Sequence, residues 1–364
     1  MQVIPITADR REEWNAFVAQ EPSFALLQSW EWGEFKEKLG WTALRVAAEQ
    51  QGRIVAGAQI LVKPAPLGLA SIAYIPRGPV GNWLDEAIAP PLLAELHRVA
   101  RRYRAIFLKV EPPLLPSPAT CAKLQQHNFR ASHYPNQPQA TIVVNLSSDL
   151  DDILRPMRKK TRQYIKQATA KGVTVRIGGQ EHLPAFYNLM QITGRRSQFA
   201  PRMLDYYEHE WQTFADNNQT VLLMAFHEER LLAVRTAYYF GRHAAEFHAG
   251  SLAEEGDLHP NYLLVWEAIK WAKAQGCASY DLWGIPNEIG QMAQAGEEAP
   301  VSDRADGLWG VYRFKSGFSK NIISYIGAYD YVYSPLLYAS ITNKFFNGDT
   351  LDRIATRWDA FRRG

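Results

Sequence analysis

Cysteine is scarce in this chain of 364 residues, in which only Cys121 and Cys277 occur. The two lie far apart and lack the spacing of metal ligands, which argues against a disulfide framework and against a zinc site. The sequence also lacks a nucleotide-binding P-loop, an HExxH metal motif and a nucleophile-elbow serine. Its nine histidines are scattered. We therefore expect no metal, and a reducing cytoplasmic compartment is the simplest location.

Long apolar runs are missing as well. No run reaches the roughly 20 residues that a membrane-spanning helix needs. The first residues, MQVIPITADRREEW, lack the basic flank and apolar core of a secretion signal. The sequence therefore predicts a protein that is neither secreted nor integral to a membrane. A Tyr- and Phe-rich tail helix leaves peripheral contact with the inner membrane face open, although packing on the body is its expected role.

The composition is that of an ordinary globular protein, with 47% hydrophobic and 21% charged residues. A chain of this length can bury a full core and is expected to divide into two domains. The net charge of +3 and the pI of about 8.7 permit a nucleic-acid or phosphorylated partner but do not require one. The position of the charges is therefore more informative than their sum.

The most basic stretch extends from Leu150 to Gly172. Its cations lie mostly away from the apolar residues, which predicts a helix with a cationic face. Such a face suits a phosphate backbone, but a solvated face that keeps the protein soluble explains the charges equally well. The cations are Arg155, Arg158, Lys159, Lys160, Arg162, Lys166 and Lys171.

The order of the expected elements repeats along the chain. Each half contains, in this order, a hairpin, a strand, a helix and a second strand. In the first half these are expected over 42–64, 70–75, 87–102 and 105–110. In the second half they are expected over 221–240, 244–251, 261–275 and 279–283. The repeat indicates a duplicated α/β unit, and a strand over 139–146 is expected to finish the first copy.

The stretch 307–320, GLWGVYRFKSGFSK, places one cation, Lys315, among aromatic residues and glycines. Glycines permit close approaches, and aromatic rings supply flat apolar surface around the charge. A lysine held there could meet a phosphate or a developing oxyanion. The local pattern alone favours a strand with a solvated lysine. The polar segment 287–306 that precedes it is expected to be a loop or lid.

Two features suit a site at the end of a sheet. Glu111 ends a predicted inner strand and is a candidate acid or base, although a strand-ending carboxylate without such a role is the commoner case. The turn 77–81, RGPVG, partly matches the glycine-rich anion-binding turn of acyltransferases that use acetyl-coenzyme A, but Pro79 removes a backbone donor. The matching turn 258–261 has no glycine. These degraded turns do not favour coenzyme A as a cofactor.

Five stretches together resemble the Fem family of bacterial peptidyltransferases, which move an amino acid from aminoacyl-tRNA onto a peptidoglycan precursor. They are SWEWGEFKEKLGW, YIPRGPV, RKKTRQYIKQATAKGV, HPNYLLVWEAIKWAKAQGCASYDLWGIP and GVYRFKSGF. The resemblance covers nearly the whole chain. It implies an α/β fold of two tandem acetyltransferase-like (GNAT-like) domains, 1–148 completed by 326–364 and then 149–325, with no coiled-coil arm. It also implies no cofactor, aminoacyl-tRNA as co-substrate, and a lipid-linked or UDP-linked precursor as partner.

The resemblance implies roles for single residues. Lys315, with Phe314 beside it, matches the family's lysine near the tRNA acceptor end, where it would stabilise charge as an amine attacks the aminoacyl ester. Glu111 stands where members usually carry aspartate, so the general base is either Glu111 or the substrate itself. The residues implied to face tRNA are Arg155, Arg158, Lys159, Lys160, Arg162 and Lys166. The residues expected to hold the precursor are Lys36, Arg77, Arg202, Tyr206 and Tyr262.

Two other functions remain open at the level of sequence. Because a fold does not fix a substrate, the chain could transfer an acyl or aminoacyl group to another envelope acceptor, such as a polysaccharide or a lipid head group. It could also bind a cell-wall precursor without catalysis. Lys315, in turn, could act on the transition state or only position tRNA.

Overall fold

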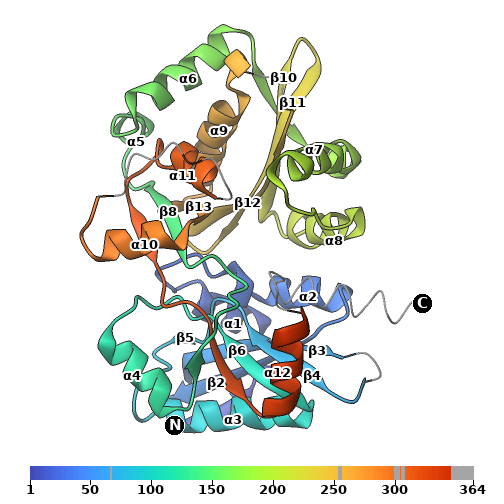
Figure 1. The fold of residues 1–364 in the computed structure, drawn as a ribbon, viewed down its shortest axis with the longest axis vertical. Coiled ribbons are helices and arrows are strands. Elements are labelled where there is room, and N and C mark those ends of the chain that lie inside the picture. The colour runs from blue at the N-terminus through green and yellow to red at the C-terminus, as the bar shows by residue number, and fades with distance from the viewer. Residues whose placement is uncertain (66–67, 253–255, 299–303, 305–307, 346–364) are drawn as a thin grey trace. The chain divides into compact units, whose positions relative to one another are not determined.

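The structure, a computed structural model, describes residues 1–65, 68–252, 256–298, 304 and 308–345. The chain forms two compact units (Figure 1). The first combines Met1–Gln139 with Ser324–Gly364, and the second is Ala140–Ile323. Among the described residues, no helix is both long and apolar enough to cross a bilayer.

The first unit is built on one mixed sheet. Its strands are β1 (Gln2–Pro5), β2 (Thr42–Gln50), β3 (Arg53–Pro64), β4 (Ser71–Ile75), β5 (Val80–Gly81), β6 (Ala105–Val110), β7 (Arg130–Ala131) and β15 (Tyr329–Val332). Its helices are α1 (Arg11–Val18), α2 (Trp30–Lys38), α3 (Ala89–Arg102), α4 (Pro118–Gln126) and α12 (Pro335–Phe345). The strand order is β1-β2-β3-β4-β6-β15-β7, and β5 pairs with β3.

Side chains of the first sheet alternate between two helical layers. Ala58 and Ile60 of β3 join the apolar core beneath α3, to which that helix contributes Leu92 and Leu96. Gln59, between them, points the other way, and its side-chain amide donates to the Leu27 carbonyl in the segment before α2 over 3.3 Å. This period of two is what an inner strand covered on both faces requires.

The second unit has the same kind of sheet. Its strands are β8 (Ala140–Asn145), β9 (Thr174–Gly178), β10 (Thr220–His227), β11 (Arg230–Phe240), β12 (His243–Ser251), β13 (Ser279–Ile285) and β14 (Ile322–Ser324). Its helices are α5 (Leu150–Leu154), α6 (Lys159–Ala170), α7 (Leu183–Ser197), α8 (Leu204–Ala215), α9 (Pro260–Ala274), α10 (Asn287–Gln294) and α11 (Trp309–Lys315). The order is β14-β8-β13-β12-β11-β10-β9. The longest helices of the described residues, α7 and α9, have 15 residues each.

The predicted duplication is visible in the topology. Each unit contains an antiparallel hairpin, β2-β3 in one and β10-β11 in the other. Each then crosses through one helix to a parallel strand, from β4 through α3 to β6 and from β12 through α9 to β13. A crossover through a helix is the usual way to join two parallel neighbouring strands in a sheet. The expected tandem α/β organisation is confirmed.

One predicted strand belongs to the second unit and not, as expected, to the first. The segment over 139–146 was expected to finish the first copy, but β8 pairs antiparallel with β13 in the second sheet. The equivalent place beside β6 is filled by β15, from the end of the chain. The two copies thus receive their last inner strands from distant segments. Local periodicity could not reveal this, because it identifies a strand and not its neighbour.

Three local predictions also need correction. Residues 309–315 form helix α11 and not a strand, and Lys315 is buried at its end. Part of the predicted loop 287–306 is helix α10, whose Ile289 is fully buried, and much of the remainder lies outside the described residues. The basic stretch divides into α5 and α6, because Pro156, which follows the first helix, has no backbone N–H with which to continue the helical hydrogen bonds.

A buried ion pair fixes β15 in the first sheet. Lys109 Nζ of β6 lies 2.8 Å from Asp330 Oδ1 of β15, and both side chains are almost completely buried. Tyr338 of α12 donates its hydroxyl to the other carboxylate oxygen over 2.7 Å, and the Tyr338 ring also packs edge-on against Phe107. The part of the tail that the structure describes, β15 and α12, therefore packs on the body, as expected.

We predict that Asp330→Ala lowers the free energy of unfolding by about 3–5 kcal/mol, because it leaves the Lys109 ammonium buried without its counter-charge. Urea unfolding followed by tryptophan fluorescence measures the loss. The double variant Lys109→Met/Asp330→Leu removes both charges and should recover most of it. A loss below about 1 kcal/mol for Asp330→Ala would contradict the role given to this pair.

Candidate active site

The candidate site of the second unit lies where two parallel strands separate. β12 and β13 pair only over His243–Ala245 and Ser279–Asp281. Beyond these pairs β12 continues along β11 and β13 continues along β8, without further pairing to one another. Backbone groups that a continuous ladder would consume are therefore available to side chains.

Lys315 takes up one of these backbone groups. Its Nζ donates to the carbonyl of Gly284 in β13 over 3.1 Å, and the side chain is only 8% exposed. Burial lowers the pKa of Lys315 to about 8, because an apolar surrounding disfavours the charged form, while Glu246 and Asp281 oppose this effect. Lys315 is thus a buried cation that titrates close to neutral pH.

A network of buried polar side chains surrounds this lysine on the separating strands. Arg235 of β11 forms an ion pair with Glu246 of β12, which also accepts a hydrogen bond from Tyr280 over 3.2 Å. Asp281 of β13 accepts from the Thr141 hydroxyl and from the backbone N–H of Trp283. The carboxylates partly compensate the buried cations, which makes their burial tolerable.

These network residues were missed from the sequence. Arg235, Glu246 and Asp281 are charged residues that interrupt mostly apolar sequence inside their strands. That interruption was the available signal, since a charge at an inner-strand position has to be paired.

An aromatic cluster connects Lys315 to the basic helix. The ring centroids of Tyr262 and Phe314 lie 4.8 Å apart, and Tyr262 also stacks on Phe318 at 5.8 Å. Tyr164 of α6 meets Tyr262 at 4.9 Å and stacks on His259 at 3.7 Å. Burial raises the pKa of the Tyr262 hydroxyl. The structure therefore packs Tyr262 on Phe314, the residue that precedes Lys315 in α11.

Helix α6 begins against the end of α11. The backbone N–H of Arg158 donates to the Gly317 carbonyl over 2.9 Å. A Cβ at position 317 would clash with the Thr161 hydroxyl, so glycine permits this close approach. Predicted cations therefore begin directly beside the Lys315 segment.

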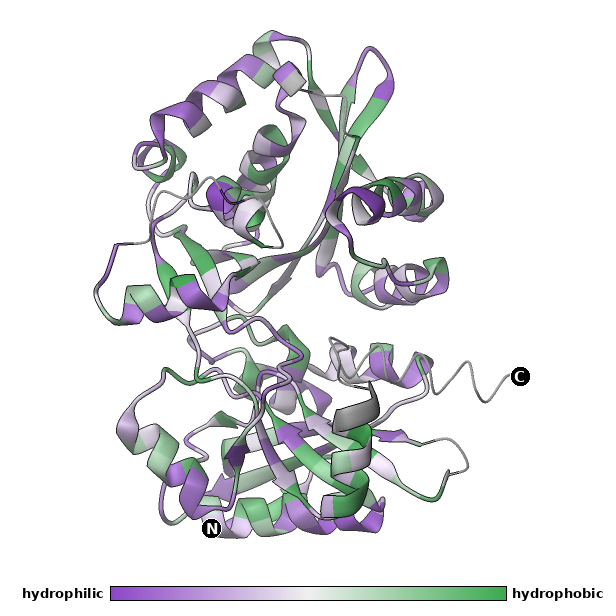
Figure 2. Cartoon of the chain, in the orientation of Figure 1, coloured by the Kyte–Doolittle hydropathy of each residue, from purple (hydrophilic) through white to green (hydrophobic). Residues whose placement is uncertain are grey.

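The six cations predicted to face tRNA do not all have the same surroundings. Lys159, Arg162 and Lys166 border one shallow hollow on the outer side of α6. Figure 2 shows that hydrophilic residues dominate this helix. Arg162 also donates to the Met157 carbonyl, and Lys160 Nζ lies 5.4 Å from the Tyr164 ring centroid. Arg155, between α5 and α6, pairs with Asp152.

Two residues predicted to hold the precursor lie together elsewhere in this unit. Arg202 precedes α8, and Tyr206 lies in its first turn. The Arg202 guanidinium lies 5.6 Å from the Tyr206 ring centroid. The hydroxyl of Tyr207 accepts the backbone N–H of Arg202 over 3.2 Å, which fixes the start of the helix.

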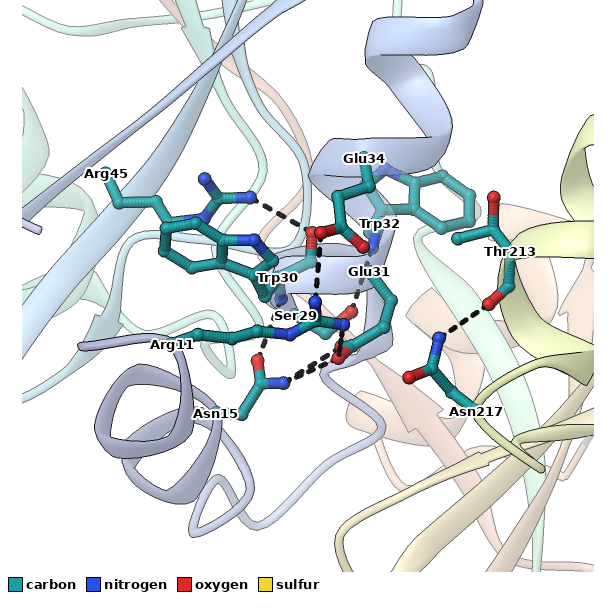
Figure 3. Close-up of polar contacts among 10 residues, drawn as sticks. All are labelled: Arg11, Asn15, Ser29, Trp30, Glu31, Trp32, Glu34, Arg45, Thr213 and Asn217. Carbon is teal, nitrogen blue, oxygen red and sulfur yellow. Dashed lines mark hydrogen bonds and ion pairs between the residues drawn. The ribbon is translucent and has the colours of Figure 1, made fainter. Parts of the chain in front are cut away.

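Lys36 belongs to the first unit, on helix α2. It is 3% exposed, and its Nζ lies 5.0 Å from the Trp32 ring centroid and 5.2 Å from that of Phe35. The helix itself is firmly anchored, as Figure 3 shows: Ser29 caps it by accepting the Trp32 N–H over 3.1 Å, and Glu31 accepts from Arg11 and Asn15. The ammonium is therefore held against aromatic faces.

Glu111 and Arg77, also in the first unit, both contact the segment before β8. The Glu111 carboxylate accepts from the Tyr74 hydroxyl and from the backbone N–H groups of Asn136 and Gln137. Burial raises the pKa of Glu111, although these donors oppose the shift. Arg77 donates to the carbonyl of Pro138 over 3.0 Å. These contacts show that Glu111 and Arg77 position the segment before β8. A role for Glu111 as acid or base, and a role for Arg77 in substrate binding, stay predictions.

Comparison with known proteins assigns the family. The profile of the FemAB family matches residues 10–128, 120–231 and 224–343. The lipid II:glycine glycyltransferase of Staphylococcus aureus (strain MRSA252) is 22% identical over 405 residues, covering 91% of this chain and 93% of that protein.

Solved structures agree with the fold. The crystal structure of FemX matches with a TM-score of 0.81 at 21% identity and covers 94% of this chain and 100% of that one. A tandem GNAT protein from the clavulanic acid biosynthesis pathway matches with a TM-score of 0.54 at 11% identity, covering 91% and 98%. The fold is therefore the tandem GNAT-like fold that the sequence predicted, and the chain belongs to the FemAB family.

Proposed function

We propose that this protein transfers an aminoacyl group from aminoacyl-tRNA to the side-chain amine of the stem peptide of a peptidoglycan precursor. The observation that carries the proposal is the burial of Lys315 where β12 and β13 separate, with an aromatic cluster leading from it to an exposed basic helix. The similarity to lipid II:glycine glycyltransferases supports the same class of reaction.

The proposed reaction requires that the amine be positioned against the ester carbonyl and that the developing negative charge be stabilised. A neutral amine attacks the ester carbonyl of the aminoacyl-tRNA, a C–N bond forms, and the ester C–O bond breaks. The amine loses a proton, and the released ribose hydroxyl gains one. An aminoacyl ester is already activated, so correct placement and a donor aimed at the developing oxyanion supply most of the acceleration. In this proposal Lys315 is that donor, because its ammonium is held in a surrounding of low dielectric.

The nucleic-acid part of the donor substrate suits α6 and the aromatic cluster. Lys159, Arg162 and Lys166 would contact phosphates of the acceptor arm. Unpaired bases at the 3′ end stack on aromatic side chains, and Tyr164 and Tyr262 supply such rings beside the lysine. A continuous route thus leads from phosphate contacts to the reacting ester.

The acceptor would be held by the remaining predicted residues. Guanidinium and ammonium groups bind phosphate strongly, so we propose that Arg202 of the second unit contacts phosphate of the precursor, and separately that Lys36 of the first unit does so. Both are held in place by aromatic neighbours, Tyr206 for the first and Trp32 for the second. Such prior placement lowers the entropic cost of binding a flexible precursor.

The proposal is tested by incubating the protein with charged tRNA and a lipid-linked or nucleotide-linked precursor. We predict transfer for the wild type and at least a hundredfold lower turnover for Lys315→Ala, with the apparent KM for aminoacyl-tRNA changed less than about threefold. A loss confined to KM would make Lys315 a tRNA-positioning residue. Absence of transfer with every charged tRNA supplied would refute the proposed reaction.

A second prediction concerns the basic helix. Lys166→Glu should raise the apparent Kd for tRNA about three- to tenfold near physiological salt and should weaken the salt dependence, because one phosphate contact is lost. Arg53→Glu, at the exposed tip of the β2-β3 hairpin, makes the same charge change as a matched control. Equal effects of the two variants, measured by filter binding at several salt concentrations, would mean that only net charge matters.

A further inference from the structure

The loop that joins α7 to α8, residues 198–203, is fixed firmly onto α7. Gln198 adopts a left-handed conformation with φ of 55° and ends the helix. The backbone N–H of Phe199 then donates to the Gly194 carbonyl over 3.0 Å. A Cβ on Gly194 would lie 2.6 Å from the Phe199 carbonyl oxygen, so only glycine permits this approach. The loop conformation is therefore specified by the backbone.

This fixed loop directs apolar side chains outward. Phe199 is 37% exposed and Met203 is 66% exposed, and both belong to the few large hydrophobic residues exposed in the described part of the chain. A shallow hollow on the same loop is lined by residues that include Phe199, Ala200 and Pro201. An outward phenylalanine and an outward methionine on one ordered loop can both contact an apolar partner.

Positive charges predominate around these residues. Arg195 and Arg196 end α7, and Arg202 precedes α8. The sequence contains no aspartate or glutamate from 182 to 204, and the first acidic residue after the loop is Asp205, in the first turn of α8. Arg196 donates to the carbonyl and the hydroxyl of Ser251, both uncharged groups, so these contacts do not cancel its charge. The loop thus presents two exposed apolar side chains among three arginines.

We propose that the loop 195–203 docks the second unit on an anionic lipid bilayer. Phe199 and Met203 enter the boundary between head groups and acyl chains, and the arginines lie at the level of the anionic head groups. Nucleic acid fits this loop less well than it fits α6, because an exposed methionine has no base-pairing or phosphate partner to meet. The consequence for the acceptor rests on the proposed function: an enzyme docked here takes its precursor in lipid-linked form.

Vesicle sedimentation tests the docking without any transfer substrate. We expect the wild type to bind phosphatidylglycerol-containing vesicles and to bind pure phosphatidylcholine vesicles at least tenfold more weakly. Phe199→Ser/Met203→Ser should weaken binding to the anionic vesicles at least tenfold, and Arg195→Gln about fivefold. Leu115→Ser is the matched control, because Leu115 is 65% exposed in the first unit and its loss should change nothing.

Transfer assays then separate this proposal from the proposed function. Phe199→Ser/Met203→Ser should transfer to a soluble nucleotide-linked precursor like the wild type and should lose activity on a lipid-linked precursor in vesicles. Wild-type binding of the double variant to anionic vesicles would overturn the docking proposal. So would binding that ignores lipid charge and requires a lipid-linked precursor, since the loop would then be a subsite for that molecule. If no precursor is ever modified, the vesicle result still decides the docking question.

Discussion

The arrangement of charged groups in the second unit depends on one buried ammonium group, which lies where two parallel strands separate. Placing Lys315 there is costly in free energy unless acceptors and counter-charges surround it. The Gly284 carbonyl becomes available because β13 leaves β12, and Glu246 and Asp281 supply the negative charge. Lys315 is the last residue of helix α11, and Phe314 and Phe318, which flank it in the sequence, pack against each other. A cation in such a position is ready to meet an anion without further reorganisation, which is what an acyl-transfer site needs.

The two units share a topology but differ at this point. In the first unit the ends of β4 and β6 are met by the chain itself, because Glu111 and Tyr74 bind the segment 136–137. In the second unit the end of β13 is contacted by Lys315 of α11, beside a network of buried charges. Duplication therefore produced one copy whose strand ends hold a connecting segment and another whose strand ends hold a cation. The exchange of β8 and β15 completes both sheets and binds the end of the chain into the first.

Local pattern predicted most of the elements, because period two and period 3.6 are imposed by the strands and helices themselves. The helices expected over 87–102 and 261–275 are both present, as α3 and α9. The local sequence pattern gave wrong predictions where the structure depends on contacts between residues far apart in the sequence. The partner of β8 depends on a strand more than a hundred residues away, and α11 is a helix too short to show a period. The residues around Lys315 were predicted in part through family resemblance, whereas Arg235, Glu246 and Asp281 were missed because their meaning depends on burial and pairing.

The pH dependence of transfer tests the central claim most directly, namely that the positive charge of Lys315 stabilises the reaction. With a pKa of about 8, Lys315 is charged below that pH and neutral above it. Single-turnover rates, corrected for spontaneous hydrolysis of the aminoacyl ester, should rise with pH as the acceptor amine deprotonates and should level off as pH passes through about 8. Above that pH the loss of charge on Lys315 offsets the further gain of neutral amine, whose ordinary pKa is about 10.4. Lys315→Arg, whose guanidinium stays charged throughout this range, should retain activity and continue to rise above pH 8. A wild-type rate that keeps rising above pH 9, or the same levelling in an active Lys315→Arg variant, would contradict the account.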